Sequence, residues 1–169
     1  MPPFHYCPIC ATPFEEKLVS GTQRPSCPGC GFVLFTDPKV VTVVVLSHKE
    51  RLLLGKRAIN PGMGEWSFFG GYVDRGEVVE TSAKREVKEE TNLDIEISGL
   101  IGVYSTQGNP HILLAYYAKI EDDQIQQLQR QPEEVSELAF FTLDQLPALA
   151  FPLDYEILAQ WQSSRDKQK

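Results

Sequence analysis

The sequence predicts an α/β sandwich with a mixed sheet, preceded by a small cysteine-rich unit. All four cysteines fall within the first 30 residues, whereas β-branched and aromatic runs recur from residue 39 onward. These runs lie on both sides of one strongly charged helical segment, and a second helical pattern closes the chain. This order is typical of helices packed on a mixed sheet. We expect the small unit over residues 1–36 and the main domain over residues 37–169.

The composition limits the classes of function. Hydrophobic residues make up 42% of the 169 residues and charged residues 23%, which is ordinary for a globular protein. The longest apolar run, Val40 to Leu46, is too short to span a bilayer, so we expect a cytoplasmic protein without a membrane partner. The formal net charge of -7 argues against nucleic acid as a partner. A polyanionic substrate would therefore need metal ions or local Arg and Lys side chains.

The cysteines form two Cys-x-x-Cys pairs with sixteen residues between them: Cys7, Cys10, Cys27 and Cys30. This spacing matches a tetrahedral zinc site in which each pair turns two thiolates toward one ion. Two disulfides in a secreted protein are the alternative, which the absence of a signal-peptide pattern disfavours. Four thiolates close the coordination shell, so the predicted Zn²⁺ is structural. Its binding would supply folding free energy that so short a segment lacks.

Zinc ribbons often bind nucleic acid, but this segment has no basic stripe. Residues 1–36 contain only Lys17 and Arg24 as certain cations, against Glu15 and Glu16. We therefore expect a scaffold or dimerisation role for the ribbon.

The main domain begins with a predicted hairpin, KVVTVVVLSHKERLLLGKR, in which polar SHKE separates two apolar runs. The residues of NPGMGE are typical of a turn, and WSFFGG predicts a short aromatic strand that ends at a glycine pair. The polar stretch from residue 122 to residue 134 is a part-helical connector. Later elements are expected, in order, as a helix at Glu77–Thr91, strands around Ile95–Tyr104, Ile112–Ile120 and Leu138–Phe141, and a helix at Leu153–Trp161.

The first predicted helix concentrates acidic residues beside its apolar face. On a helical wheel, Glu86 and Glu90 border the apolar stripe and Glu89 lies at its flank. A merely solvated acidic face is the alternative, and it would lie opposite the stripe. Carboxylates clustered beside a core raise one another's pKa unless cations compensate, and Mg²⁺ or Mn²⁺ would do so. The stripe consists of Val79, Ala83 and Val87.

Residues at both ends of this helix support a binding loop. Gly71 lies where bare backbone can expose a carbonyl to a metal. Glu77, at the helix start, can reach Arg85, although a surface ion pair of Arg85 with Glu89 is the simpler reading. Asn92 follows the helix, where a left-handed residue would end it.

Gly71, Glu77 and the run Arg85-Glu-Val-Lys-Glu-Glu-Thr-Asn-Leu resemble the Nudix box. The match holds at every defining position except Asn92, where the family usually has glycine, and asparagine also tolerates the left-handed conformation. LLLGKR, GEWSFFGG and EVSELAFFTLDQLP resemble the family's surrounding elements. The resemblance implies the Nudix α/β/α sandwich.

The resemblance also implies roles for individual residues. Glu86, Glu89 and Glu90, with the Gly71 carbonyl, would bind Mg²⁺ or Mn²⁺, and Glu77 with Arg85 would brace the loop and helix. Members hydrolyse a nucleoside diphosphate linked to another moiety, with water attacking one phosphorus. The general base varies within the family: a box glutamate is one possibility and Glu134 is another, with Glu133 as its runner-up.

The ribbon followed by the box is more similar to plant-type FAD and ADP-ribose pyrophosphatases than to NADH pyrophosphatases. The Ser-Gln-Pro-Trp-Pro-Phe-Pro run of the latter is absent from this chain. The resemblance implies a small-molecule nucleotide as substrate, with FAD or ADP-ribose first, and a homodimer. Hydrolysis of NADH, clearance of oxidised nucleotides and a non-catalytic nucleotide-sensing or nucleic-acid-binding regulator remain the alternatives.

Candidates for nucleotide contact include Arg57, Trp66, Tyr72 and Tyr104. The aromatic rings can stack on adenine or flavin, and the arginine can bind phosphate or ribose. The alternatives are core packing for the rings and a plain surface cation for Arg57.

Overall fold

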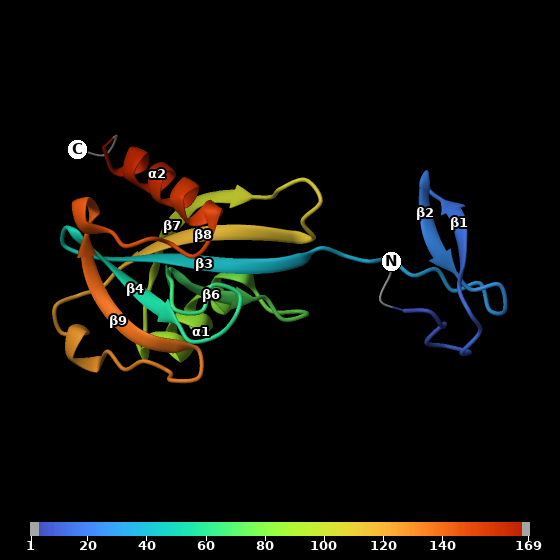
Figure 1. Ribbon diagram of the computed structural model, residues 1–169, viewed down its shortest axis with the longest axis horizontal. Helices are drawn as coiled ribbons and strands as arrows, with labels where there is room; N and C mark the ends of the chain where they lie inside the picture. Colours follow the sequence, from blue (N-terminus) through green and yellow to red (C-terminus); the bar gives the residue numbers. More distant parts are fainter. Residues whose placement is uncertain (1–3, 167–169) are drawn as a thin grey trace. The chain divides into compact units, whose positions relative to one another are not determined.

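The computed structural model describes residues 4–166 and divides into two compact units, residues 1–38 and 39–169 (Figure 1). The division falls slightly beyond the boundary expected from the sequence.

The N-terminal unit is a small hairpin with two cysteine turns. Strands β1 (Glu15–Val19) and β2 (Thr22–Ser26) pair antiparallel. In each turn a cysteine carbonyl accepts a hydrogen bond from four residues further on, at 2.9 Å for Ala11 N–H to Cys7 and 3.0 Å for Gly31 N–H to Cys27. Both turns therefore fold around their first cysteine.

The larger unit is built on a seven-stranded mixed sheet with the order β5-β4-β3-β8-β7, in which β6 also pairs with β3 and β9 with β4. Among the described strands, β3 and β8 are the parallel pair and the other pairs are antiparallel. The strands are β3 (Lys39–His48), β4 (Arg51–Arg57), β5 (Trp66–Ser67), β6 (Phe69–Tyr72), β7 (Ile97–Tyr104), β8 (His111–Lys119) and β9 (Val135–Thr142). The helices are α1 (Val79–Thr91) and α2 (Pro152–Asp166), with 3-10 turns at Ile125–Gln127 and Leu143–Gln145.

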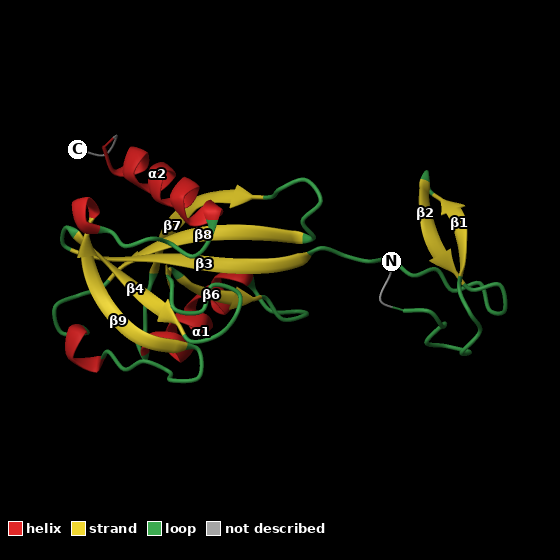
Figure 2. Ribbon diagram, viewed as in Figure 1, coloured by secondary structure: helices red, strands yellow, loops and turns green. Residues whose placement is uncertain are grey.

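The two long helices pack on opposite faces of this sheet (Figure 2). Successive residues of β3 alternate between two apolar cores, with Val44 in the core beside α1 and Val45 in the core beside α2. Ala83 and Val87 of α1, both fully buried, join the first core, and Trp161 of α2 joins the second. The predicted α/β sandwich with a mixed sheet is confirmed.

Several element boundaries differ from those expected. Helix α1 begins at Val79, because Glu77 instead accepts a hydrogen bond from the Asp74 N–H in the preceding turn. The expected WSFFGG strand is two strands, since Trp66–Ser67 pairs with β4 whereas Phe69–Tyr72 pairs with β3. Strand β9 is longer than expected because it pairs along the whole of β4. Within residues 4–166, no helix has the length and apolar character needed to cross a membrane.

Candidate active site

The acidic residues of α1 lie where the helical wheel placed them, at the border of the core. Glu86 and Glu90 are 9% and 7% exposed, and they lie one turn apart beside fully buried Val87. Glu89 is more exposed, with a side-chain exposure of 52%. The apolar stripe that anchors α1 to the sheet therefore carries two carboxylates into a largely buried position.

The glycine pair of β6 lies directly against these carboxylates. The Gly70 N–H donates a hydrogen bond of 2.9 Å to Glu90 Oε2. A Cβ atom at Gly71 would lie 2.4 Å from Glu86 Oε1, so only glycine leaves room for the carboxylate. The sequence indicated close approach at this pair but not that the Gly70 N–H would bind Glu90. The Gly71 carbonyl as a metal ligand stays a prediction.

Arg85 links the loop to the helix as the sequence suggested. Its Nε donates to Glu77 Oε1 at 2.9 Å and its Nη2 to the Tyr72 carbonyl at 3.1 Å. Hydrogen bonding to Arg85 lowers the pKa of Glu77 to about 2. The same guanidinium binds Glu86 at 2.7 Å and Glu89 at 3.1 Å through Nη1. Arg85 therefore makes both the loop brace and the ion pair that the sequence offered as alternatives.

The paired strands β4 and β9 bring two further charged residues toward the box. The register shifts between Lys56 and Arg57, so that Arg57 lies opposite Val135. The carbonyl of Glu134 accepts a hydrogen bond of 2.8 Å from the Ala58 N–H, which fixes Glu134 beside the end of β4. The charges of Arg57 and Glu134 both act on the pKa of Glu90. The charge of Glu134 also acts on the pKa of Glu86.

The electrostatics of this cluster fit a hard divalent cation. Burial raises the pKa of Glu90 to about 8; the Gly70 N–H and Arg57 oppose the rise, and the charges of Glu86 and Glu134 add to it. Burial likewise raises the pKa of Glu86, although Arg85 opposes it. The nearby arginines therefore do not compensate the carboxylates fully. An all-oxygen donor set of this kind suits Mg²⁺ or Mn²⁺.

Asn92 ends α1 in the left-handed conformation. Its φ is 63°, and its N–H donates to the Lys88 carbonyl at 2.9 Å. The cap expected from the sequence is confirmed, so asparagine replaces glycine at this position without loss of the helix end.

The three aromatic candidates lie in different surroundings. The Trp66 ring packs edge-on against Phe141 at 4.8 Å, and both Trp66 and Tyr104 pack against the core beside α2. Tyr72 is 54% exposed and its hydroxyl lies 3.2 Å from His111 Nε2. Trp66 and Tyr104 thus pack against the core, which was the alternative to nucleotide contact. Nucleotide contact by any of the three rings stays a prediction.

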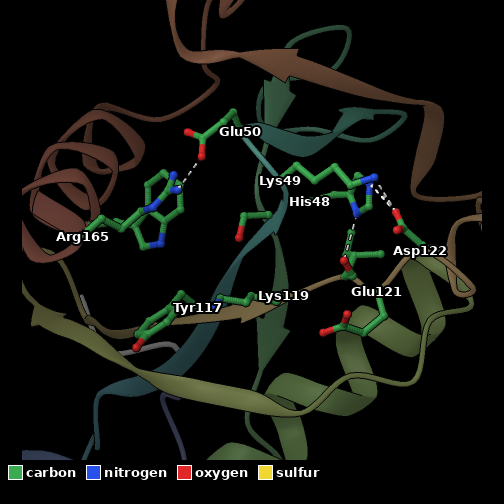
Figure 3. Close-up of a pocket in the computed structure, with 11 residues that line it drawn as sticks. His48, Lys49, Glu50, Tyr117, Lys119, Glu121, Asp122 and Arg165 are labelled. Atoms are coloured by element: carbon green, nitrogen blue, oxygen red, sulfur yellow. Dashed lines mark hydrogen bonds and ion pairs between the residues drawn. The ribbon is translucent and has the colours of Figure 1, made fainter. Parts of the chain in front are cut away.

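A cavity of about 430 Å³ opens away from the box, where β3 turns into β4 (Figure 3). Asp122 lies 3.2 Å from His48 Nε2 and 2.7 Å from Lys49 Nζ, and Arg165 pairs with Glu50 at 3.4 Å. Figure 3 shows these pairs as dashed lines along the wall of the cavity. Because these charges neutralise one another, we do not assign the substrate to this cavity.

In the N-terminal unit the four thiols converge. Their Sγ atoms all lie within 4.8 Å of one another, with Cys7 and Cys30 3.6 Å apart and Cys10 and Cys27 3.4 Å apart. A disulfide would need about 2.0 Å, whereas a zinc tetrahedron with Zn–S bonds of about 2.3 Å has sulfur separations of about 3.8 Å. The thiols therefore fit a closed metal site, and zinc as its metal stays a prediction.

The family model of the NUDIX domain matches residues 36–161. The chain belongs to the NUDIX family. The predicted family and its hydrolase class are therefore confirmed.

Curated and structural relatives agree with this assignment. The NAD-capped RNA hydrolase NudC of Stutzerimonas stutzeri is 31% identical over 147 residues, which cover 85% of this chain and 50% of that protein. The ADP-ribose pyrophosphatase of Methanocaldococcus jannaschii is 34% identical over 121 residues, 70% of each chain. A NUDIX hydrolase structure from Nitrosomonas europaea has a TM-score of 0.86 at 26% identity, covering 97% of this chain and 93% of that one. This chain spans about half the length of the NudC relative.

Proposed function

We propose that this NUDIX protein is a divalent-metal-dependent pyrophosphatase that hydrolyses ADP-ribose or FAD to two monophosphates. The observation that carries the proposal is the pair of buried carboxylates against the glycine pair, with Glu86 against Gly71 and Glu90 accepting a hydrogen bond from the Gly70 N–H. Burial raises the pKa of both carboxyls, and the charge of Glu134 adds to the rise. A diphosphate bound there brings still more negative charge. Divalent cations held by Glu86, Glu89 and Glu90 would neutralise both and acidify the attacking water.

The chain's own residues supply the remaining parts of the proposed reaction. Glu134 is the candidate base that takes a proton from water as the water oxygen forms a bond to one phosphorus. The bond from that phosphorus to the bridging oxygen breaks, and the leaving phosphate keeps the bridging oxygen. Arg85 holds Glu86 and Glu89 in place through bonds of 2.7 Å and 3.1 Å, and Arg57 offers a cation near Glu90.

The substrate preference rests on similarity. The ADP-ribose pyrophosphatase relative matches over 70% of both chains, whereas the NudC relative matches over only 50% of its own length. The absence of the Ser-Gln-Pro-Trp-Pro-Phe-Pro run points the same way. NADH and oxidised nucleoside triphosphates remain the alternative substrates, and a homodimer in the cytoplasm remains our proposal for the assembly and location.

A substrate panel tests the proposal. The zinc-loaded protein is incubated with Mg²⁺ or Mn²⁺ and with FAD, ADP-ribose, NADH or nucleoside triphosphates, and the products are resolved by chromatography. We expect AMP and a second monophosphate from ADP-ribose or FAD, and a loss of roughly a hundredfold or more in kcat for Glu89→Gln.

Glu96→Gln is the matched control, because the Glu96 side chain is 91% exposed and its ion pair within residues 4–166 is with Lys84, which is not one of the predicted metal ligands. Turnover of none of the substrates, with Glu89→Gln indistinguishable from the wild type, would eliminate the enzymatic proposal. Gel-shift assays over a range of salt concentrations address the nucleic-acid-binding alternative.

A further inference from the structure

Arg57 lies in an arrangement that a free surface cation would not need. Its Nε donates to the Pro61 carbonyl at 2.7 Å, and its guanidinium carbon lies 5.0 Å from the centroid of the Phe151 ring. Its backbone also donates to Glu65 at 2.9 Å and accepts from Gly64 at 2.9 Å. Three segments of the chain therefore fix one side chain and its backbone.

One of these segments is the start of α2. Phe151 precedes the helix, Pro152 is its first residue and Asp154 follows in the same turn, with the Asp154 N–H bonded to the Phe151 carbonyl at 3.0 Å. Asp154 is only 3% exposed, and its Oδ2 has no hydrogen-bond partner among residues 4–166. A buried carboxylate without a hydrogen-bond partner destabilises the fold unless a positive charge lies nearby.

Phe151 links Asp154 to Arg57, because its carbonyl accepts from the Asp154 N–H and its ring lies against the guanidinium. Among residues 4–166 no hydrogen bond or ion pair joins the two side chains directly. The Arg57 charge lowers the pKa of Asp154, although burial outweighs it and raises the pKa to about 7 overall. Within the described residues, neither terminal nitrogen of Arg57 donates a hydrogen bond, so both stay available to a ligand. Arg57 lies opposite Val135 in the strand pairing, and the next residue, Ala58, donates to the Glu134 carbonyl at 2.8 Å. Arg57 therefore lies at the end of β4, beside the segment that carries the candidate base.

We propose that the first turn of α2, through Phe151 and Asp154, holds the guanidinium of Arg57 so that its two free nitrogens bind a phosphate oxygen of the substrate. Asp154 is then a positioning residue, acting through Arg57 and touching no substrate itself. A planar guanidinium fixed on one edge presents a fork that matches a phosphate. This inference rests on the proposed function and names Arg57 as the cation that binds the substrate phosphate.

A double-mutant cycle tests the coupling. Asp154→Asn keeps an oxygen that can accept the Phe151 N–H, so the helix start is retained while the charge is lost. We expect Asp154→Asn to raise KM by roughly tenfold with a smaller effect on kcat, and Arg57→Ala to raise it more. In the Arg57→Ala background Asp154→Asn should have almost no further effect. Glu156→Gln, an exposed position on the same helix, should leave KM unchanged.

A second readout does not depend on turnover. The titration of the Asp154 carboxyl, followed by carbon-13 NMR, should move to higher pH in Arg57→Ala because a favourable charge is removed. Additive effects on KM, or an Asp154 titration that Arg57→Ala leaves unchanged, would overturn the inference and leave Asp154 as a helix cap. If the wild type hydrolyses nothing in the panel, the proposed function fails, and the titration still decides whether the two residues act as a pair.

Discussion

Replacing Gly71 by alanine should remove metal binding and activity while leaving the fold intact. The added Cβ would lie 2.4 Å from Glu86 Oε1, 2.5 Å from Cδ and 2.6 Å from Oε2. Ordinary contact begins near 3.4 Å, so the carboxylate must move by about 1 Å. A displacement of this size in a catalytic constellation costs roughly a hundredfold in rate.

The fold should survive this substitution. The obstructing atoms are the end of one flexible side chain, not backbone, and Glu86 can rotate away from the new methyl group. Replacing glycine by alanine also reduces the entropy of the unfolded chain, a gain of about 0.4–1 kcal/mol. We therefore expect the free energy of unfolding to change by no more than about 1 kcal/mol.

The assay combines kcat/KM at saturating Mg²⁺, Mn²⁺ affinity by calorimetry and the free energy of unfolding in urea. Gly76→Ala is the matched control: Gly76 has φ of +86°, and a methyl group added there would meet no described atom within 4 Å. This control should lose about 1 kcal/mol of stability and keep its metal affinity. The reasoning would be refuted if Gly71→Ala bound Mn²⁺ and turned over substrate within about threefold of the wild type.

Three further predictions follow from the described contacts. Burial raises the pKa of Asp154 to about 7 in the folded protein, against 3.8 for a free side chain. Between about pH 4 and pH 7 the unfolded state therefore binds fewer protons than the folded state. The free energy of unfolding should fall as pH rises through this range, by at most about 4 kcal/mol. Asp154→Asn should flatten this part of the pH profile of urea denaturation, and an unchanged slope would contradict the assignment. Chelation should remove one zinc per chain, as measured by atomic absorption, and residues 1–36 should then unfold, as followed by NMR. If this segment stayed folded with no zinc bound, the predicted zinc ribbon would be wrong. Asn92→Ala should cost about 1–2 kcal/mol in thermal denaturation because φ is 63°, whereas Asn92→Gly should be close to neutral; equal losses would refute the cap.

Local features of the sequence were sufficient for the parts of the site that lie on one helix. The period of Val79, Ala83 and Val87 determines which face of α1 packs on the sheet, and the carboxylates follow from that face. The cap at Asn92 and the pairs of cysteines depend on residues within a few positions of each other. These interactions are short in sequence, so residue type and spacing determine them.

Contacts between distant segments were not predictable in this way. Nothing near Arg57 in the sequence indicates the Phe151 ring 5.0 Å from its guanidinium carbon, because β4 and the start of α2 meet only when the sheet and its covering helix have formed. The split of the aromatic strand depends on which neighbour each half pairs with, β4 for Trp66 and β3 for Phe69. Similarly, the aromatic character of Trp66 and Tyr104 does not tell which side of the sheet they face.

The register shift opposite Arg57 has a consequence for how the chain tolerates changes in length. Lys56 lies opposite Glu137 and Arg57 opposite Val135, so Ser136 is an extra residue on β9, and its hydroxyl donates to the Lys56 carbonyl at 3.0 Å. Lys56 and Arg57 are consecutive and point to opposite sides of the sheet, so their partners Glu137 and Val135 do the same across the extra residue. Deleting Ser136 would therefore remove the bulge and leave Val135 on its present, buried side, whereas adding one more residue there would turn Val135 out of the core. At this point β9 should tolerate a loss of one residue better than a gain of one.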